Sequence, residues 1–169
     1  MNDLSDKESL GELIQYIVIR LGEEQFGIDI RYVDNIVRMQ QITRVPKVQH
    51  YIKGVINIRG DIVPVMSLRL IMEMNEDELT GKTRIIIVKM SGGSLVGFIV
   101  DQVAHVLTLD SNNVENVRRG DDRRHGEFLS GVGKYEGGLV SILDLNTLEL
   151  ESLEGRDRER EKQLIAVNE

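Results

Sequence analysis

The side chains that most often carry chemistry are few in this sequence, and their spacing forms no catalytic pattern. Cysteine is absent, which excludes disulfides, thiol nucleophiles and thiolate metal sites. The three histidines, His50, His105 and His125, show no HxxxH or HExxH spacing, so we expect no metal site. Ser130 and Ser141 have no histidine or acid placed in the sequence to activate them. The sequence therefore predicts no enzyme.

Two short motifs invite a functional interpretation that the sequence does not support. Residues 131–134 (GVGK) resemble a phosphate-binding loop, but Tyr135 follows the lysine and the upstream glycine spacing is wrong. Residues 59–61 (RGD) spell a cell-adhesion tripeptide, which is common by chance. We expect no cofactor. A small β-barrel enzyme or ligand-binding protein remains an alternative, and it would require a polar pocket with perturbed titratable groups.

The composition limits the class of protein. The chain of 169 residues carries 21 Lys+Arg and 28 Asp+Glu, a net charge of −7, and its basic residues do not cluster, which argues against nucleic acid as a partner. Hydrophobic residues make up 41% and aromatic residues only 4%, so Ile, Val and Leu supply the apolar mass and favour strands. No apolar run approaches the roughly 18 residues of a membrane span. Residues 1–12 do not resemble a signal peptide, and we expect a cytoplasmic protein.

The apolar segments are short and separated by turn residues, a pattern that predicts strands. We expect strands at 14–21, 26–30, 51–58, 62–68, 85–90 and 95–100. Apolar residues at three-residue spacing after two of these strands, at 30–37 and 103–107, predict short helical turns. Residues 38–50 are expected to form an irregular linker, and the acidic stretch 73–82 a connector.

The pattern that begins at residue 14 starts again at residue 84, which indicates an internal duplication. Apolar strands match one another easily, but glycines mark backbone positions with special requirements. Four pairs of glycines coincide, two at an offset of 70 and two at an offset of 77: Gly22 and Gly92, Gly27 and Gly97, Gly54 and Gly131, Gly60 and Gly137. The offset changes only where a linker lengthens, so the repeat is not broken inside a strand.

Halves of this size bury little alone and would combine their cores. We therefore predict a mainly all-β fold of two small β-barrels from an internal duplication, which also protects exposed strand edges. The expected boundaries are a flexible arm at 1–13, a domain at 14–150 with halves at about 14–80 and 81–150, and a charged tail at 151–169 that forms a helix or no fixed structure.

The repeat also shows where function could lie, because a residue that differs at an equivalent turn is not required by the barrel. Arg59 precedes Gly60, whereas Glu136 precedes the equivalent Gly137. An arginine at an exposed turn suits an interface anchor, since its planar guanidinium binds carboxylates and stacks on side chains. The alternative is that an exposed turn tolerates either charge.

Several segments resemble the CheW family of chemotaxis coupling proteins, over about residues 14–150. The most specific is the stretch 51–60 (YIKGVINIRG) followed by 62–65 (IVPV). Residues 26–30 (FGIDI), 97–103 (GFIVDQV) and 129–133 (LSGVG) continue the likeness, with Val33, Ile36, Leu68 and Arg69.

The resemblance implies a non-enzymatic adaptor of two SH3-like five-stranded β-barrel subdomains that serves in two-component signal transduction. Its implied partners are the cytoplasmic tip of methyl-accepting chemoreceptors and the regulatory domain of the histidine kinase CheA. It also implies a cytoplasmic protein recruited to membrane-associated receptor arrays, without membrane insertion or nucleic-acid binding. A related scaffold for another kinase pathway, such as surface motility, is the alternative.

The resemblance also implies functional residues. The receptor-binding groove would include Arg59, Gly54, Val33, Asn35, Thr83, Arg84 and Ile85. Two of these depart from the family, which usually has Glu at Asn35 and an apolar residue at Arg84, so Arg59 would pair with Asp34 or Asp61 or stay free for the receptor. Kinase contacts would involve Val103 and Phe128, although both could instead be core residues, and for Phe128 the core is favoured.

Overall fold

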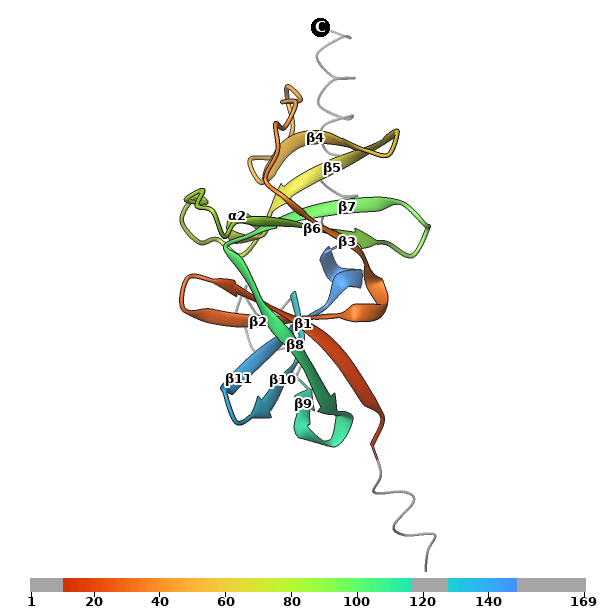
Figure 1. The fold of residues 1–169 in the computed structure, drawn as a ribbon, viewed down its shortest axis with the longest axis vertical. Coiled ribbons are helices and arrows are strands. Elements are labelled where there is room, and N and C mark those ends of the chain that lie inside the picture. The colour runs from red at the N-terminus through yellow and green to blue at the C-terminus, as the bar shows by residue number, and fades with distance from the viewer. Residues whose placement is uncertain (1–10, 117–127, 149–169) are drawn as a thin grey trace, which may run out of the picture.

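The computed structural model describes residues 11–116 and 128–148, and within these ranges the chain folds into two β-sheets. We call them sheet A and sheet B; sheet A lies in the lower half of Figure 1 and sheet B in the upper half. Sheet A has the strand order β8-β1-β2-β11-β10-β9, with β1 Leu13–Leu21, β2 Glu24–Asp29, β8 Gln102–Asp110, β9 Val114–Asn116, β10 Leu129–Tyr135 and β11 Gly138–Leu143. Sheet B has the order β3-β6-β7-β5-β4, with β3 Val33–Arg38, β4 Ile52–Ile58, β5 Asp61–Ser67, β6 Arg84–Lys89 and β7 Leu95–Val100.

Each sheet takes strands from both halves of the sequence, so the subdomains differ from the expected halves 14–80 and 81–150. The β1–β2 hairpin of the first half completes sheet A, and the β6–β7 hairpin of the second half completes sheet B. The pairing is equivalent in both: β1 and β6 lie antiparallel to β8 and β3, while β2 and β7 lie parallel to β11 and β5. This repeated pairing agrees with an internal duplication whose two copies have exchanged their first hairpins.

The predicted helical turns are largely wrong. Only the 3-10 turn η1 Ile30–Tyr32 is helical in the first of them, and the following residues form β3. The second predicted turn lies within β8. Three-residue spacing of apolar side chains misled the prediction, because burial in β3 alternates with a period of two, as in a strand with one exposed face.

The strands expected at 51–58 and 62–68 and the connector follow the prediction more closely. Residues 59–60 form a two-residue turn between β4 and β5, and residues 73–82 contain no strand. Before this connector the chain makes one turn of helix, α2 Leu68–Ile71, whose first turn is capped by the Ser67 hydroxyl accepting from Leu70 N–H. A second short 3-10 turn, η2 Ser111–Asn113, joins β8 to β9. The predicted N-terminal arm and charged tail fall mostly outside the described residues.

The largest hydrophobic cluster lies between the two sheets, and each sheet has a smaller cluster of its own. In β1, Ile17 and Ile19 face the shared cluster, while Val18 faces the interior of sheet A. In β6, Ile86 faces the shared cluster and Ile85 the interior of sheet B. Both strands are therefore buried on both faces, which explains their nearly continuous apolar sequences.

Candidate functional site

Arg59 projects from the turn between β4 and β5. Its backbone is in the left-handed region, with φ of 50°, and Gly60 follows with φ of 90°, a combination typical of a type I′ hairpin turn. The side chain is 73% exposed, and its Nη2 lies 4.0 Å from Asp34 Oδ2 on β3. Of the two acids considered as partners, Asp34 is the one within ion-pair distance among the described residues. An exposed pair at this distance contributes little stability, so the guanidinium stays available for a further carboxylate.

The Asn35 side chain bonds to the backbone of its own strand. Its Oδ1 accepts a hydrogen bond from the backbone N–H of Ile36 at 2.9 Å. It lies at an irregularity in the pairing of β3 with β6, where the register shifts after Val33. Val33 itself is half-buried and packs against the shared cluster.

A surface hollow of about 490 Å³ lies next to Asp34, at the end of sheet B that carries the Arg59 turn. Its lining combines charged and apolar side chains, and Ile62 is 65% exposed. The lining residues are Asp34, Asp61, Ile62, Pro64, Lys89, Gly93, Ser94 and Leu95. The region around Arg59 thus offers a cation, two carboxylates and exposed apolar surface to a partner.

Gly54 shapes the backbone of β4. Its φ is 143°, and a Cβ at this position would overlap the carbonyl oxygen of Thr43 and come within 2.8 Å of Ile42 Cγ2. Thr43 and Val55 exchange two backbone hydrogen bonds of 2.9 Å, so the linker crosses β4 directly over this glycine. Gly54 is required for that crossing.

Thr83, Arg84 and Ile85 lie at the beginning of β6, away from Arg59. Thr83 is buried and its hydroxyl accepts from Thr80 N–H, and Ile85 is fully buried inside sheet B. Arg84 Nη1 donates to the carbonyls of Gly81 and Thr83 at 2.9 and 2.8 Å.

Strand register separates the two groups of predicted receptor-binding residues. Arg84 pairs with Arg38 at one end of β3, whereas Asn35 pairs with Ile87. Ile87 lies three residues further along β6, or about 10 Å. About 10 Å of β6 therefore separates Thr83, Arg84 and Ile85 from the part of sheet B next to Arg59.

Arg84 instead belongs to a hollow at the junction of the two sheets. The hollow measures about 270 Å³ and is lined by Lys82, Arg84, Gln102 and Val103. Val103 is half-buried and packs against the shared cluster. Phe128 is only 9% exposed and belongs to that cluster, which is the core interpretation favoured from the sequence.

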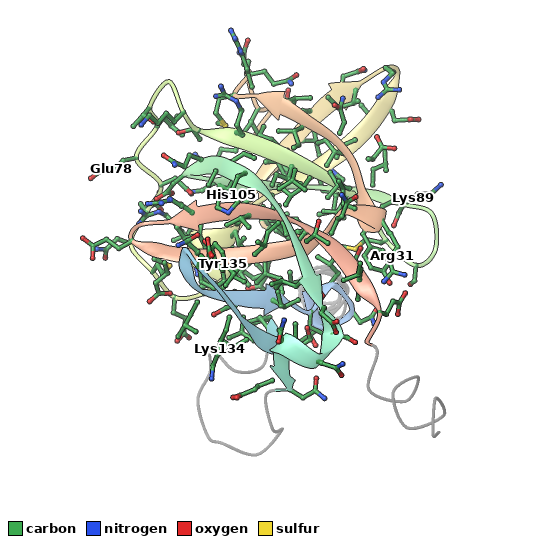
Figure 2. All side chains as sticks on the ribbon, turned by 60° about the horizontal axis from the view of Figure 1, so that its bottom comes forward. Arg31, Glu78, Lys89, His105, Lys134 and Tyr135 are labelled. Carbon is green, nitrogen blue, oxygen red and sulfur yellow. The ribbon has the colours of Figure 1, made fainter. Side chains whose placement is uncertain are left out.

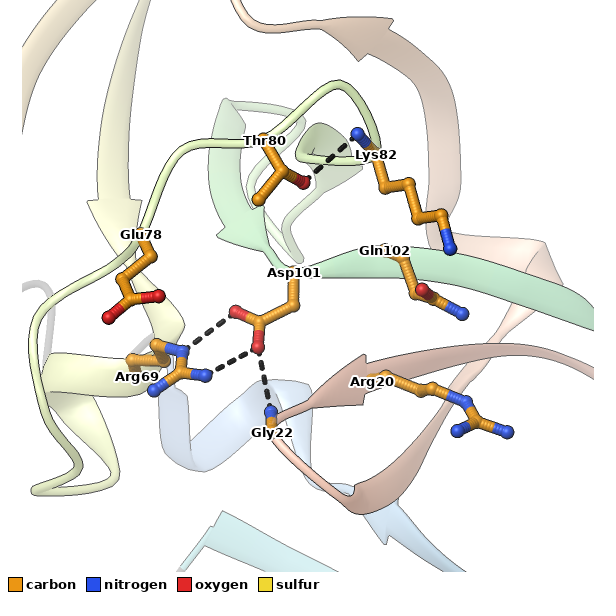
Figure 3. A pocket seen from close by; sticks show the side chains of 8 residues that line it. All are labelled: Arg20, Gly22, Arg69, Glu78, Thr80, Lys82, Asp101 and Gln102. Carbon is orange, nitrogen blue, oxygen red and sulfur yellow. Dashed lines mark hydrogen bonds and ion pairs between the residues drawn. The ribbon is translucent and has the colours of Figure 1, made fainter.

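A third hollow, of about 300 Å³, shares Lys82 and Gln102 with the hollow at Arg84 and contains an ion pair that the sequence reasoning missed (Figure 3). Arg69 Nε donates to Asp101 Oδ1 at 2.7 Å and Arg69 Nη2 to Oδ2 at 2.5 Å. The backbone N–H of Gly22 also donates to Oδ2, at 2.7 Å. Burial raises the pKa of Asp101, but the hydrogen bonds from Arg69 and Gly22 and the charge of Arg69 outweigh it, so the pKa lies below its usual value.

Asp77 is a second carboxylate that the sequence reasoning missed. The fully buried Ser67 hydroxyl donates to its Oδ2 at 2.5 Å, and Oδ1 is buried without a hydrogen-bond partner in the described part of the chain. Burial raises the pKa of Asp77 above its usual value, although the Ser67 hydrogen bond and the charge of Lys53 act in the opposite direction. This carboxylate ties the connector to the end of β5.

Two side chains considered in the sequence analysis, Ser130 and His105, lie on sheet A. Ser130 Oγ donates to the carbonyl of Ile142 at 3.5 Å, and no histidine is among its recorded partners. The ring of His105 lies 5.9 Å from that of Tyr135 (Figure 2). The Tyr135 hydroxyl donates to Gln25 Oε1 at 2.6 Å. Within residues 11–116 and 128–148, no group of three or more His, Asp or Glu side chains could hold a metal ion. In the same ranges no helix is long and apolar enough to cross a membrane.

Comparison with known proteins identifies the family. Residues 15–151 match the family model of the CheW-like domain. The chain belongs to the CheW family. It is 35% identical over 132 residues to the chemotaxis protein CheW of Bacillus subtilis, covering 78% of this chain and 84% of that protein. It is 31% identical over 148 residues to the CheW of Thermotoga maritima, covering 88% and 93% of the two chains.

A solved CheW structure has the same fold. The crystal structure of the scaffolding protein TtCheW from Thermoanaerobacter tengcongensis superposes with a TM-score of 0.73 at 31% identity, covering 79% of this chain and 90% of that chain. The fold is thus that of a CheW scaffold, as the resemblance implied. Both members of the missed ion pair, Arg69 and Asp101, lie in segments that carry the CheW resemblance, and this was the available signal for them.

Proposed function

We propose that this chain is a non-enzymatic chemotaxis adaptor that couples methyl-accepting chemoreceptors to the histidine kinase CheA. The observation that carries the proposal is the match to the CheW-like domain over residues 15–151, with named chemotaxis proteins among its relatives. The adaptor acts by binding two partners at once and breaks no covalent bond. We also propose that it works in the cytoplasm, at membrane-associated receptor arrays.

The proposed receptor site centres on Arg59. An exposed guanidinium with one acid at 4.0 Å can accept a carboxylate from a receptor's helical hairpin, and the neighbouring Ile62 can take an apolar side chain. Val33, Asn35 and Arg84 contribute partly exposed surface on the same sheet. Gly54, Thr83 and Ile85 act indirectly, because they hold the strands that carry these side chains.

The proposed kinase site lies on β8 in sheet A. Val103 is partly exposed, and Val106 on the same strand is 55% exposed. Phe128 supports this region from the core and offers little surface of its own. Placing the two partners on different sheets allows both to bind together.

Coupling requires that the contact energies differ between signalling states. A receptor can change kinase activity through this adaptor only if its conformations favour the ternary complex unequally. Couplings of about 1–3 kcal/mol are typical of allosteric proteins and would suffice.

The test is reconstitution of CheA autophosphorylation with receptor fragments, with and without this chain. Arg59→Glu should strongly weaken receptor recruitment while the protein stays folded and still binds CheA. Lys134→Glu is the matched control, since Lys134 is similarly exposed on the other hairpin. Wild-type recruitment by Arg59→Glu would remove Arg59 from the site, and absence of binding to either partner would refute the adaptor function.

A further inference from the structure

Three segments that are far apart in the sequence meet where the two sheets join. Gly22 lies in the turn between β1 and β2 of sheet A, Arg69 lies in α2 directly after β5 of sheet B, and Asp101 lies between β7 of sheet B and β8 of sheet A (Figure 3). Asp101 accepts three hydrogen bonds from the other two residues, and its own N–H donates to the carbonyl of Arg20 at 3.1 Å. We call Gly22, Arg69 and Asp101 the junction clamp.

The junction clamp differs from an ordinary surface ion pair. Arg31 and Asp29 form a similar bidentate pair, but they are two residues apart and the Arg31 side chain is 60% exposed. The Arg69 and Asp101 side chains are only 16% and 24% exposed, and they are 32 residues apart. A partly desolvated bidentate pair has narrow limits on distance and angle.

The buried interior of the junction is apolar. Residues of β1 and β2 pack against residues of β6 and β7 in the shared cluster. Apolar burial stabilises the junction but is non-directional, so related packings with slightly different angles have similar energies. The clamp has one favourable geometry, and it connects the β1–β2 turn to α2 through the Asp101 carboxylate.

We propose that Arg69 and Asp101 are positioning residues that fix the orientation of sheet A relative to sheet B. The shared cluster holds the sheets together, and the junction clamp selects one angle between them. Surfaces on the two sheets, such as the exposed hairpin ends near Ile62 and Leu139, are then presented at a fixed separation and direction. A partner that touches both sheets meets a preorganised surface.

The chain is well suited to a direct measurement, because it contains no cysteine. Ile62 on β5 and Leu139 on β11 are 65% and 60% exposed, so Ile62→Cys and Leu139→Cys provide a pair of spin-label sites, one on each sheet. Double electron–electron resonance on the full chain gives the distribution of distances between them. In the Arg69→Met variant we expect the distribution to broaden and its maximum to shift.

Three further variants complete the experiment. Arg31→Met removes the exposed pair between Asp29 at the end of β2 and Arg31 in η1, two residues apart, and should leave the distribution as in the parent chain. Asp101→Asn removes the charge but can still accept from Gly22, and should broaden the distribution less than Arg69→Met. Arg69→Lys keeps the positive charge but not the bidentate geometry, so its distance distribution should be narrower than that of Arg69→Met and broader than that of the parent chain.

The outcomes separate orientation from stability. A lower melting temperature with an unchanged distribution well below the transition would make the pair merely stabilising and overturn the proposal. Equal broadening in Arg31→Met would also overturn it, as would failure of both Arg69→Met and Asp101→Asn to fold. The measurement involves no receptor or kinase, so its result is independent of the proposed function.

Discussion

The hairpins β4–β5 and β10–β11 are equivalent in the internal repeat, yet they end differently. Both have two-residue loops between paired strands, Ile58 with Asp61 and Tyr135 with Gly138. In sheet B the loop residues Arg59 and Gly60 both have positive φ, whereas in sheet A the positive φ falls one residue later, on Gly138. The repeat therefore preserves strand register and loop length but not turn geometry or charge. We place the receptor site at the tip of the β4–β5 hairpin, which carries Arg59.

The largest effect should come from the glycines beneath the crossing segments. Gly54 and Gly131 are equivalent, and a Cβ on Gly131 would come within 2.8 Å of the Glu115 carbonyl oxygen in β9. Because Gly54 combines positive φ with overlap of the Thr43 backbone, we expect Gly54→Ala to lower the free energy of unfolding by about 3 kcal/mol. Gly131→Ala should cost less. Urea unfolding measures the free energy of unfolding of both variants. Equal losses would contradict the prediction that the backbone at Gly54 is the more restricted of the two.

The junction should respond next, and its response should depend on pH. The folded-state pKa of Asp101 is lowered, so its contribution to stability is present above the unfolded-state pKa, about 4, and is lost as pH falls through the folded-state value. Arg69→Met should lower the free energy of unfolding by about 2 kcal/mol at pH 7. The difference from the parent should shrink toward pH 2.

Arg31→Met is the matched control for this titration and should cost only a few tenths of a kcal/mol at pH 7. Urea unfolding at several pH values measures both variants. If the difference in free energy of unfolding between Arg69→Met and the parent stays constant with pH, Asp101 is not the group whose charge stabilises the junction.

Exchanging the charges of the two tips tests their functional difference. Arg59→Glu should weaken receptor binding by about 2 kcal/mol, or roughly 30-fold, as expected for an interface arginine. Glu136→Arg should leave receptor affinity unchanged, because the equivalent tip of sheet A lies outside the proposed receptor site. Titration of a receptor fragment by calorimetry measures both affinities, and similar losses in the two variants would indicate a general electrostatic effect.

The smallest effect concerns the turns themselves. Arg59→Gly relieves a left-handed conformation at a non-glycine residue and should raise the free energy of unfolding by about 0.5 kcal/mol. Glu136→Gly has no such conformation to relieve and should lower it slightly. Thermal unfolding measures both variants. Changes of opposite sign in the free energy of unfolding would support the difference in turn geometry, whereas changes of the same sign would count against it.

Local patterns predicted the elements better than their arrangement. The runs 14–21 and 85–90 are apolar because β1 and β6 are buried on both faces, and the glycine pairs revealed the repeat. The exchange of hairpins left no local signal, because the parallel pairings of β2 with β11 and β5 with β7 join distant segments.

For the candidate site, the sequence indicates single residues but not how the fold places them relative to one another. Arg59 differs from its repeat equivalent and so could be recognised from the sequence, and its exposure agrees with a surface role. The separation of Arg84 from Arg59 depends on the register of β3 with β6, which the sequence does not reveal. Asp101 and Arg69 pair across 32 residues, and charged pairs of this kind have no periodicity.

The exchange of the β1–β2 and β6–β7 hairpins has a consequence for the history of the fold. A polypeptide of half this length would have unpaired strand edges on its own, but two copies could complete each other by trading hairpins as a symmetric dimer. Fusion of the two genes through the connector would preserve that dimer within one chain. Cleavage within residues 73–82 should accordingly yield two fragments that remain associated and do not separate into independent modules.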